Sequence, residues 1–270
     1  MLSKNHFTFP FYIPRICRLW SNWPEYLFNY VSGGSRPAEY RMRSGVRLID
    51  DMGTLPGTIA VVFVRQEYGD VKRFRSIVDV GAHMGMFAVH AAQSGPDVKV
   101  YCYEPEERNF ACLQRNIGIN GLETRVSAFP QAVASSNGMR TLALGESLSN
   151  SFHIIPDDAT YQTVSCTTLN EIFARHRLET IDLLKMNCEG AEYEILESCS
   201  DEDFQRISNI RLEYHNLNSR QRNGESITQL LTAKGYRIER FTRYQKTSGF
   251  IWAARLLLIA KVPDVLIAFA

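Results

Sequence analysis

Polar side chains that could do chemistry follow several apolar, strand-like segments of this 270-residue chain. Carboxylates and an imidazole in such places can bind ribose hydroxyls, accept a proton or hold a divalent cation. In a doubly wound sheet, ligands bind in the crevice beyond the carboxyl ends of the strands. One acid at a strand end is common, but four polar strand ends are hard to explain by solubility, so we expect a shared site. The side chains are Asp79, Glu104, Asn187, Glu189, Glu213 and His215.

A glycine turn follows the first of these segments. The run 76–85 (SIVDVGAHMG) predicts a strand, a tight turn and the start of a helix. A dinucleotide-binding turn has the spacing G-x-G-x-x-G. Here the spacing is D-x-G-x-x-x-G, and His83 stands where a second glycine would admit a pyrophosphate. Gly81 would let a ligand approach the backbone, and Gly85 would let the new helix pack against the strand. The turn therefore favours a ligand without phosphate, such as S-adenosylmethionine, over NAD.

The expected cofactor contacts centre on Glu104, which ends the next strand and could bind both ribose hydroxyls. The alternative for Glu104 is a structural charge at a helix N-terminus. Asp79 is expected to hold the ligand's ammonium group, and the Gly81 carbonyl could accept from the same group. The backbone near Gln131 would lie beside the adenine ring. The predicted cofactor-binding residues are Asp79, Gly81, Ala82, His83, Gly85, Glu104, Pro105, Gln131 and Ala132.

Strand-like and helix-like segments alternate from residue 76 onward. This rhythm predicts an α/β protein with a Rossmann-like, doubly wound, mostly parallel sheet and helices on both faces. Residues 58–68 are ambiguous between helix and buried strand. Residues 135–165 are expected to be an irregular polar loop and a lid over the substrate. The expected strands are 46–50, 76–80, 98–103, 125–129, 181–186, 207–212, 236–241 and 249–258, and the expected helices are 85–94, 106–118, 167–177, 187–198 and 225–234.

Three segments are expected along the chain. Residues 1–44 are rich in aromatic side chains and predict a short helical arm packed on the main domain. The alternatives for this arm are a part of the substrate pocket or a peripheral membrane contact. Residues 45–258 form the main domain, and residues 259–270 form an apolar tail for core packing or an oligomer contact.

The bulk composition narrows the class of partner. A net charge of +1 does not indicate a nucleic-acid partner, so a small-molecule or glycan acceptor is expected. Six scattered cysteines without a C-x-x-C pair predict reduced thiols and a cytoplasmic location. No apolar run reaches the roughly 18 residues that span a bilayer, and the N-terminus has no clean signal peptide.

Longer motifs extend the pattern over about residues 45–255. They are V-D-V-G-A-H-M-G, Y-E-P with N-F-x-x-L-x-R-N-I-x-x-N-G-L, T-L-N-E-I, I-D-L-L-K-M-N-C-E-G-A-E-Y-E-I-L and R-L-E-Y-H. In this order and spacing the chain resembles the FkbM-type methyltransferase family. The resemblance implies the class I methyltransferase fold, S-adenosylmethionine as cofactor and O-methylation of a sugar, glycan or natural-product hydroxyl.

The resemblance also places Asn187, Glu189 and Glu192 on the family's I-D-V-E-G-A-E block, which faces the reacting methyl group. The family usually has Asp where Asn187 stands, so one charge is missing, and Asn is common where His83 stands. The predicted catalytic residues are His215, Glu189, Glu213 and Asn187. A sugar hydroxyl needs a base in contact, and His215 is expected to serve near neutral pH without a large pKa shift.

Several alternatives stay open for this cluster and for the chain. Asn187, Glu189, Glu213 and His215 could hold a divalent cation, or His215 could be purely structural. The alternatives to a methyltransferase are an NAD- or nucleotide-sugar-dependent Rossmann enzyme, which the missing middle glycine disfavours, and a catalytically inactive cofactor-binding protein. Only Asn187 favours the inactive protein. The oligomeric state and the acceptor are not fixed by the sequence.

Overall fold

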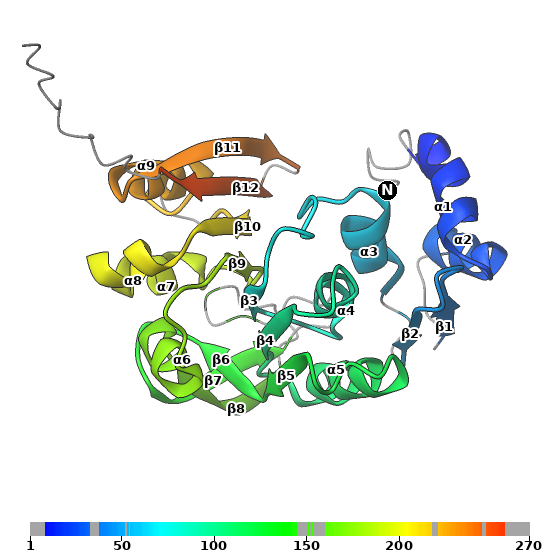
Figure 1. The fold of residues 1–270 in the computed structure, drawn as a ribbon, viewed down its shortest axis with the longest axis horizontal. Coiled ribbons are helices and arrows are strands. Elements are labelled where there is room, and N and C mark those ends of the chain that lie inside the picture. Colours follow the sequence, from blue (N-terminus) through cyan, green and yellow to red (C-terminus); the bar gives the residue numbers. More distant parts are fainter. Residues whose placement is uncertain are drawn as a thin grey trace, which may run out of the picture.

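The computed structural model describes residues 9–32, 38–51, 53, 55–144, 151, 153, 160–217, 221–244 and 247–256. Its centre is a seven-stranded sheet in the order β11-β12-β10-β9-β3-β4-β5 (Figure 1). Five neighbouring strands, from β10 to β5, are parallel, and β12 runs antiparallel to both β10 and β11. The strands are β3 (Ser76–Val80), β4 (Lys99–Tyr103), β5 (Val126–Phe129), β9 (Leu183–Met186), β10 (Asn209–His215), β11 (Tyr236–Arg243) and β12 (Ser248–Arg255).

Helices cover both faces of this sheet, as the alternating pattern predicted. Figure 1 shows α4 and α5 on one side of the sheet and α6, α7, α8 and α9 on the other. The sheet is doubly wound and mostly parallel, so neighbouring residues of one strand pack into different layers. In β3, for example, Ile77 belongs to the core under α4 and Val78 to the core under α7. The helices are α4 (Met86–Ala92), α5 (Glu107–Ile119), α6 (Leu169–His176), α7 (Glu192–Ser198), α8 (Asp201–Arg206) and α9 (Gly224–Ala233).

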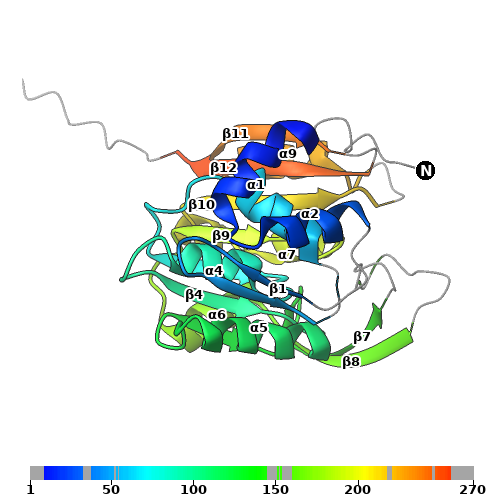
Figure 2. The same ribbon diagram turned by 90° about the vertical axis from the view of Figure 1, so that its right-hand side faces the viewer.

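The N-terminal residues form the expected helical arm and also half of a hairpin. The arm contains η2 (Phe9–Tyr12), α1 (Ile13–Leu19) and α2 (Trp23–Val31), and β1 (Ala38–Arg41) pairs with β2 (Arg47–Asp50). All of these lie on the side of the sheet that carries α4 and α5 (Figures 1 and 2). Trp20 is fully buried, stacks on Tyr26 and belongs to the same core cluster as Ile77. The predicted boundary at residues 44/45 therefore falls inside the β1–β2 hairpin.

The ambiguous segment 58–68 is helical as far as Val64. It consists of α3 (Leu55–Ile59) and a π-helical turn, η3 (Ala60–Val64), in which the N–H of Arg65 donates to the carbonyl of Ala60 at 2.7 Å. Val62, Phe63 and Val64 are all buried, so this apolar run is a core helix rather than a strand. The chain leaves η3 through Gln66, which has a left-handed φ of 53°.

The prediction of a less regular, polar loop over residues 135–165 is wrong for residues 138–144 and 160–165, which form strands. Described residues there form two strands of a second sheet with the order β6-β8-β7. The strands are β6 (Gln131–Val133), β7 (Gly138–Leu144) and β8 (Thr160–Thr167). Buried Leu142, Val164 and Cys166 give this sheet a small core of its own, which the scattered glycines and serines of the sequence concealed. Residues 145–150, 152 and 154–159 of the predicted lid lie outside the described residues, as does the apolar tail.

Among the described residues, no helix is long and apolar enough to cross a membrane. The six cysteines are free thiols.

Candidate functional site

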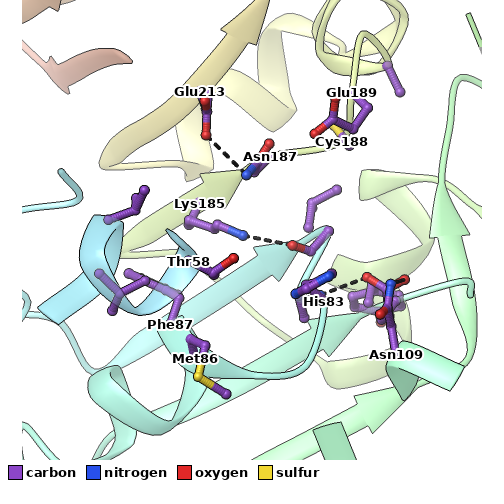
Figure 3. A pocket seen from close by; sticks show the side chains of 18 of the residues that line it. Thr58, His83, Met86, Phe87, Asn109, Lys185, Asn187, Cys188, Glu189 and Glu213 are labelled. Atoms are coloured by element: carbon purple, nitrogen blue, oxygen red, sulfur yellow. Dashed lines mark hydrogen bonds between the residues drawn. The ribbon is translucent and has the colours of Figure 1, made fainter. Parts of the chain in front are cut away.

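A cavity of about 450 Å³ opens at the carboxyl ends of β3, β4, β9 and β10. Figure 3 shows Glu213, Asn187 and Glu189 on one side of it, His83 and Asn109 on another, and Thr58, Met86 and Phe87 on a third. Most of the predicted residues meet here, as the strand-end pattern indicated. Those that line the cavity are Gly81, Ala82, His83, Glu104, Pro105, Ala132, Asn187, Glu189 and Glu213.

Asp79, Gly85, Gln131 and His215 are not in the cavity wall. The side chain of Gln131 instead donates to Ser165 at 3.1 Å and accepts from Arg175 at 2.5 Å. Of the two residues predicted to lie beside the adenine ring, only Ala132 lines the cavity. Residues 131 and 132 lie on opposite faces of β6, so their side chains point in opposite directions. The sequence alone does not show which of the two points into the site.

The glycine turn is held by contacts within the protein. Gly81 has φ +71°, and a Cβ there would lie 1.9 Å from the carbonyl oxygen of Asn187. Gly85 has φ +86°, and its Cβ would lie 2.5 Å from Leu113 of α5. Glycine is thus required at Gly81 because the turn touches the end of β9, whereas we expected the close approach of a ligand. It is required at Gly85 because α5 packs on the turn, whereas we expected the new helix to pack against the strand.

Asp79 does not face a ligand ammonium. It is fully buried, and its carboxylate lies 2.7 Å from the ammonium of Lys185, which also donates to the carbonyl of Gly81 at 2.8 Å. Burial raises the pKa of Asp79, and Lys185 opposes that change. The protein's own lysine therefore occupies both groups that were expected to bind the ligand's ammonium, because Lys185 and Asp79 are directly paired across β9 and β3.

Glu104 lies where the ribose-binding acid was expected and also organises the turn. Its carboxylate accepts from the backbone N–H of His83 at 2.7 Å and of Glu106 at 3.1 Å. Burial raises the pKa of Glu104 to about 7, although these N–H groups favour the charged form. Its Oε1 also accepts from the Asn109 amide at 3.4 Å, and its Oε2, which among the described residues accepts only from His83, keeps a lone pair for a ribose hydroxyl. The structural role at a helix N-terminus, which was the alternative for Glu104, is filled by Glu106 instead. The Glu106 side chain accepts from the backbone N–H groups of Arg108 and Asn109 at the start of α5.

His83 offers unused ring nitrogens to the cavity. Its φ is 51°, and neither ring nitrogen has a hydrogen-bond partner among the described residues. Burial lowers the pKa of His83 to about 4, so the ring is neutral and has one donor and one acceptor. The amide oxygen of Asn109, also in the cavity wall, is likewise buried without a partner.

Asn187 and Glu213 form a hydrogen-bonded pair across β9 and β10. The Asn187 amide donates to the Glu213 carboxylate at 3.2 Å (Figure 3). Burial, opposed by the charge of His215, raises the pKa of Glu213 to about 7. An aspartate at position 187 would place a second charge against this carboxylate, whereas asparagine orients it by donation. Glu213 is therefore a carboxylate of tuned basicity that lines the cavity.

His215 lies behind the cavity wall between two carboxylates. Its Nδ1 is 3.2 Å from Glu192 and its Nε2 is 3.4 Å from Glu189. Burial opposes the charged ring, but Glu192, Glu189 and Glu213 together raise the pKa of His215 to about 10. The expectation of an imidazole near its ordinary pKa is wrong. A protonated ring cannot accept a proton at neutral pH, so His215 neutralises acids instead.

Glu192 and Glu189 differ although both face His215. Burial alone would raise the pKa of Glu192, but His215 and the backbone hold it below its usual value. Its carboxylate accepts from the N–H of Cys188 at 3.0 Å and of Gly190 at 2.8 Å, which closes the loop after β9. Burial raises the pKa of Glu189. Glu192 is thus the ionised partner that holds the loop, and Glu189 faces the cavity.

The raised pKa of His215 predicts a pH-dependent stability. A histidine whose pKa is about 10 when folded and about 6.5 when unfolded contributes stability fully below pH 6.5 and loses it as the pH rises toward 10. We expect His215→Gln to lower the free energy of unfolding most at pH 6 and least at pH 10, as measured by urea denaturation at pH 6, 8 and 10. An equal loss at all three values would mean that His215 is neutral in the folded protein.

The divalent-cation alternative finds no support. In the described ranges no group of three or more His, Cys, Asp or Glu side chains is placed to hold a metal ion. The oxygen-rich cluster at β9 and β10 is organised around the ring of His215 instead.

Several cavity residues were missed in the sequence, among them Lys185, Tyr68 and Arg65. Lys185 had a readable signal, since a lysine inside an apolar strand indicates a buried charge that needs a partner, although the sequence does not show which acid it pairs with. Tyr68 and Arg65 gave none, because they follow a helix whose path to the cavity depends on tertiary contacts. Tyr68 is buried, and its carbonyl accepts from Arg211 of β10, which draws the segment against the sheet.

The cavity fits S-adenosylmethionine on its own contacts. Glu104 supplies acceptors for a ribose, and Ala132, Val133 and Leu142 supply an apolar wall for a base. The unpartnered amide oxygen of Asn109 adds a hydrogen-bond acceptor beside them. This donor and acceptor set suits a nucleoside without phosphate groups, because the described cation at the glycine turn, Lys185, is already paired with Asp79.

Comparison with known proteins finds similar methyltransferases. Residues 79–238, more than half of the chain, match the methyltransferase FkbM domain. Methyltransferase sdnD of Sordaria araneosa is 25% identical over 168 residues, which cover 51% of this chain and 65% of that protein. The 31-O-demethyl-FK506 methyltransferase FkbM of Streptomyces tacrolimicus is 28% identical over 170 residues, which cover 52% of this chain and 65% of that protein. The matches thus span less than two thirds of these relatives.

Among solved structures, a SAM-dependent methyltransferase from Agrobacterium tumefaciens is similar with a TM-score of 0.46 and 12% identity, over 81% of this chain and 70% of that one. The matched domain itself runs from Asp79 through the strand ends that carry Glu104, Asn187 and Glu213. The chain belongs to the FkbM methyltransferase family.

Proposed function

We propose that this protein is an S-adenosylmethionine-dependent O-methyltransferase that acts on a hydroxyl of a sugar, glycan or natural-product intermediate. The observation that carries the proposal is the joint presence in one cavity of Glu104, at the ribose position, and Glu213, a buried carboxylate whose pKa is about 7. One side chain would bind the cofactor and the other would serve the acceptor.

S-adenosylmethionine would supply the methyl group as an electrophile on a sulfonium. The chain's own contribution is to align the acceptor and to take its proton. Glu213 is placed to accept that proton, and the Asn187 amide holds its carboxylate at 3.2 Å. Protonated His215 limits the charge that Glu189, Glu192 and Glu213 build up together. Glu189, in the cavity wall, is placed to orient the acceptor hydroxyl.

Isothermal titration calorimetry tests the cofactor. We expect the protein to bind S-adenosylmethionine and S-adenosylhomocysteine and not NAD. Binding of NAD alone would favour a Rossmann oxidoreductase, and binding of neither sulfur compound would contradict the proposal. Methyl transfer from radiolabelled S-adenosylmethionine to a panel of sugars and polyols then separates an active enzyme from an inactive cofactor-binding protein.

Glu104→Gln tests the ribose assignment. Loss of a charged acceptor for a ribose hydroxyl should weaken S-adenosylhomocysteine binding by about 10- to 100-fold in the same calorimetric assay. The matched control is Glu107→Gln, which removes the same charge from an exposed position on α5. Equal affinities of the Glu104 variant and the control would show that Glu104 serves only the glycine turn.

The remaining expectations about partners and place stay predictions. A cytoplasmic location, the absence of a nucleic-acid partner and an oligomer contact through the tail are not tested by the described residues. A role of Glu189, Gly81, Ala82, His83, Pro105 and Ala132 in binding is supported by their position in the cavity wall.

A further inference from the structure

Arg65 is a cation in the cavity wall that lacks an anion. It follows η3 directly, and its Nε is buried without a hydrogen-bond acceptor among the described residues. No described carboxylate lies within ion-pair distance of its guanidinium. A buried donor without a partner costs free energy in the folded protein unless a ligand supplies the acceptor.

The other described cation of the cavity wall is already paired with a carboxylate. This cation is Lys185, which is matched by Asp79 at 2.7 Å. The charge of Arg65 lowers the pKa of Glu213 less than the charge of His215 does, and it is the weakest of the influences on that group. The guanidinium is therefore left available to a ligand.

The protein fixes Arg65 before any ligand binds. Its guanidinium stacks over the ring of Tyr244, with 4.5 Å between Cζ and the ring centroid. The next residues are held to the sheet, because Trp252 donates to the carbonyl of Glu67 at 2.8 Å and Arg240 pairs with the Glu67 carboxylate at 2.6 Å. Gln66 keeps a left-handed backbone between these anchors. Such preorganisation strengthens binding because little freedom is lost when the ligand arrives.

We propose that Arg65 binds a carboxylate group of the ligand in this cavity. A guanidinium offers parallel N–H donors that match the two oxygens of a carboxylate, which an ammonium cannot do. The inference rests on the proposed function, and that function offers two sources of the group. One is the amino-acid end of S-adenosylmethionine, and the other is an acid group on the acceptor, as in a uronic acid.

The test compares Arg65→Gln, Arg65→Lys and the control Arg18→Gln, which changes an exposed arginine of α1. The probes are S-adenosylhomocysteine, 5′-methylthioadenosine, which shares the adenosine but lacks the carboxylate, and glucuronate against glucose on the protein saturated with S-adenosylhomocysteine. Thermal unfolding checks that each variant is folded. Calorimetry gives the affinities.

We expect Arg65→Gln to weaken one carboxylate ligand by about 10- to 100-fold, Arg65→Lys to weaken it less, and Arg18→Gln to leave it unchanged. Loss for S-adenosylhomocysteine but not for 5′-methylthioadenosine assigns Arg65 to the cofactor. Loss for glucuronate alone assigns it to the acceptor. If Arg65→Gln binds S-adenosylhomocysteine and glucuronate as the wild type does, the proposal is wrong. Failure of the wild type to bind S-adenosylhomocysteine would instead contradict the proposed function.

Discussion

Lys185→Met is expected to lower the free energy of unfolding by about 3–5 kcal/mol, because it leaves the carboxylate of Asp79 buried without its cation. Asp79 is 0% exposed and Lys185 is 4% exposed, so water cannot replace the lost partner. The change also removes the hydrogen bond to Gly81, so the glycine turn should loosen. Urea denaturation monitored by circular dichroism measures the effect.

A matched control and a double variant make this prediction specific. Lys234→Met breaks an exposed ion pair with Asp201 and should cost no more than about 1 kcal/mol. Asp79→Asn combined with Lys185→Met removes both charges and should recover part of the loss. If Lys185→Met unfolds at the same urea concentration as Lys234→Met, the buried pair does not stabilise the turn.

Glu213→Gln should reduce methyl transfer by about 100- to 10,000-fold while S-adenosylhomocysteine still binds with nearly the wild-type affinity, since the change removes the base and preserves the shape. The rate of turnover should increase with the fraction of Glu213 that is deprotonated. The wild-type rate should therefore rise as the pH passes the pKa of about 7 for this group. Initial rates over pH 5.5–9 with the best acceptor of the panel measure both effects.

Glu225→Gln is the control for this variant, because Glu225 begins α9 and pairs with exposed Arg243 outside the cavity. It should keep the wild-type rate and pH profile. If the Glu213→Gln enzyme retains full turnover, Glu213 is not the base. Either Glu189 would then accept the proton, or the acceptor would be acidic enough to lose it without a base.

The central sheet could be predicted from the sequence because local signals and global topology agree there. The run before Gly81, the Thr168 cap of α6 and the spacing of Phe110, Leu113 and Ile117 each indicate one element, and the structure confirms them. The second sheet could not be predicted. β6 and β8 pair in parallel in the sheet although β7 lies between them in the sequence, so their pairing depends on contacts between segments far apart in the chain. Helix α8 was also missed, since its six residues carry too few apolar positions to show a period.

The site could be predicted only as far as the strand ends determine it. Glu104, Asn187, Glu189 and Glu213 meet because parallel strands end at one edge, which the alternation already implied. The state of His215 could not be predicted, because its charge depends on Glu192, the first residue of α7, which is a different element from the strand that carries His215. The same holds for Asp79, whose partner Lys185 is 106 positions along the chain and adjacent only in the folded sheet.

The contact between Gly81 and the carbonyl of Asn187 has a consequence for how this protein can evolve. A side chain at position 81 would meet that oxygen at 1.9 Å, so the cofactor turn and the strand end that orients Glu213 form one rigid block. Substitutions in either half must therefore preserve the other, so a change at the turn and a change at the end of β9 cannot be made independently.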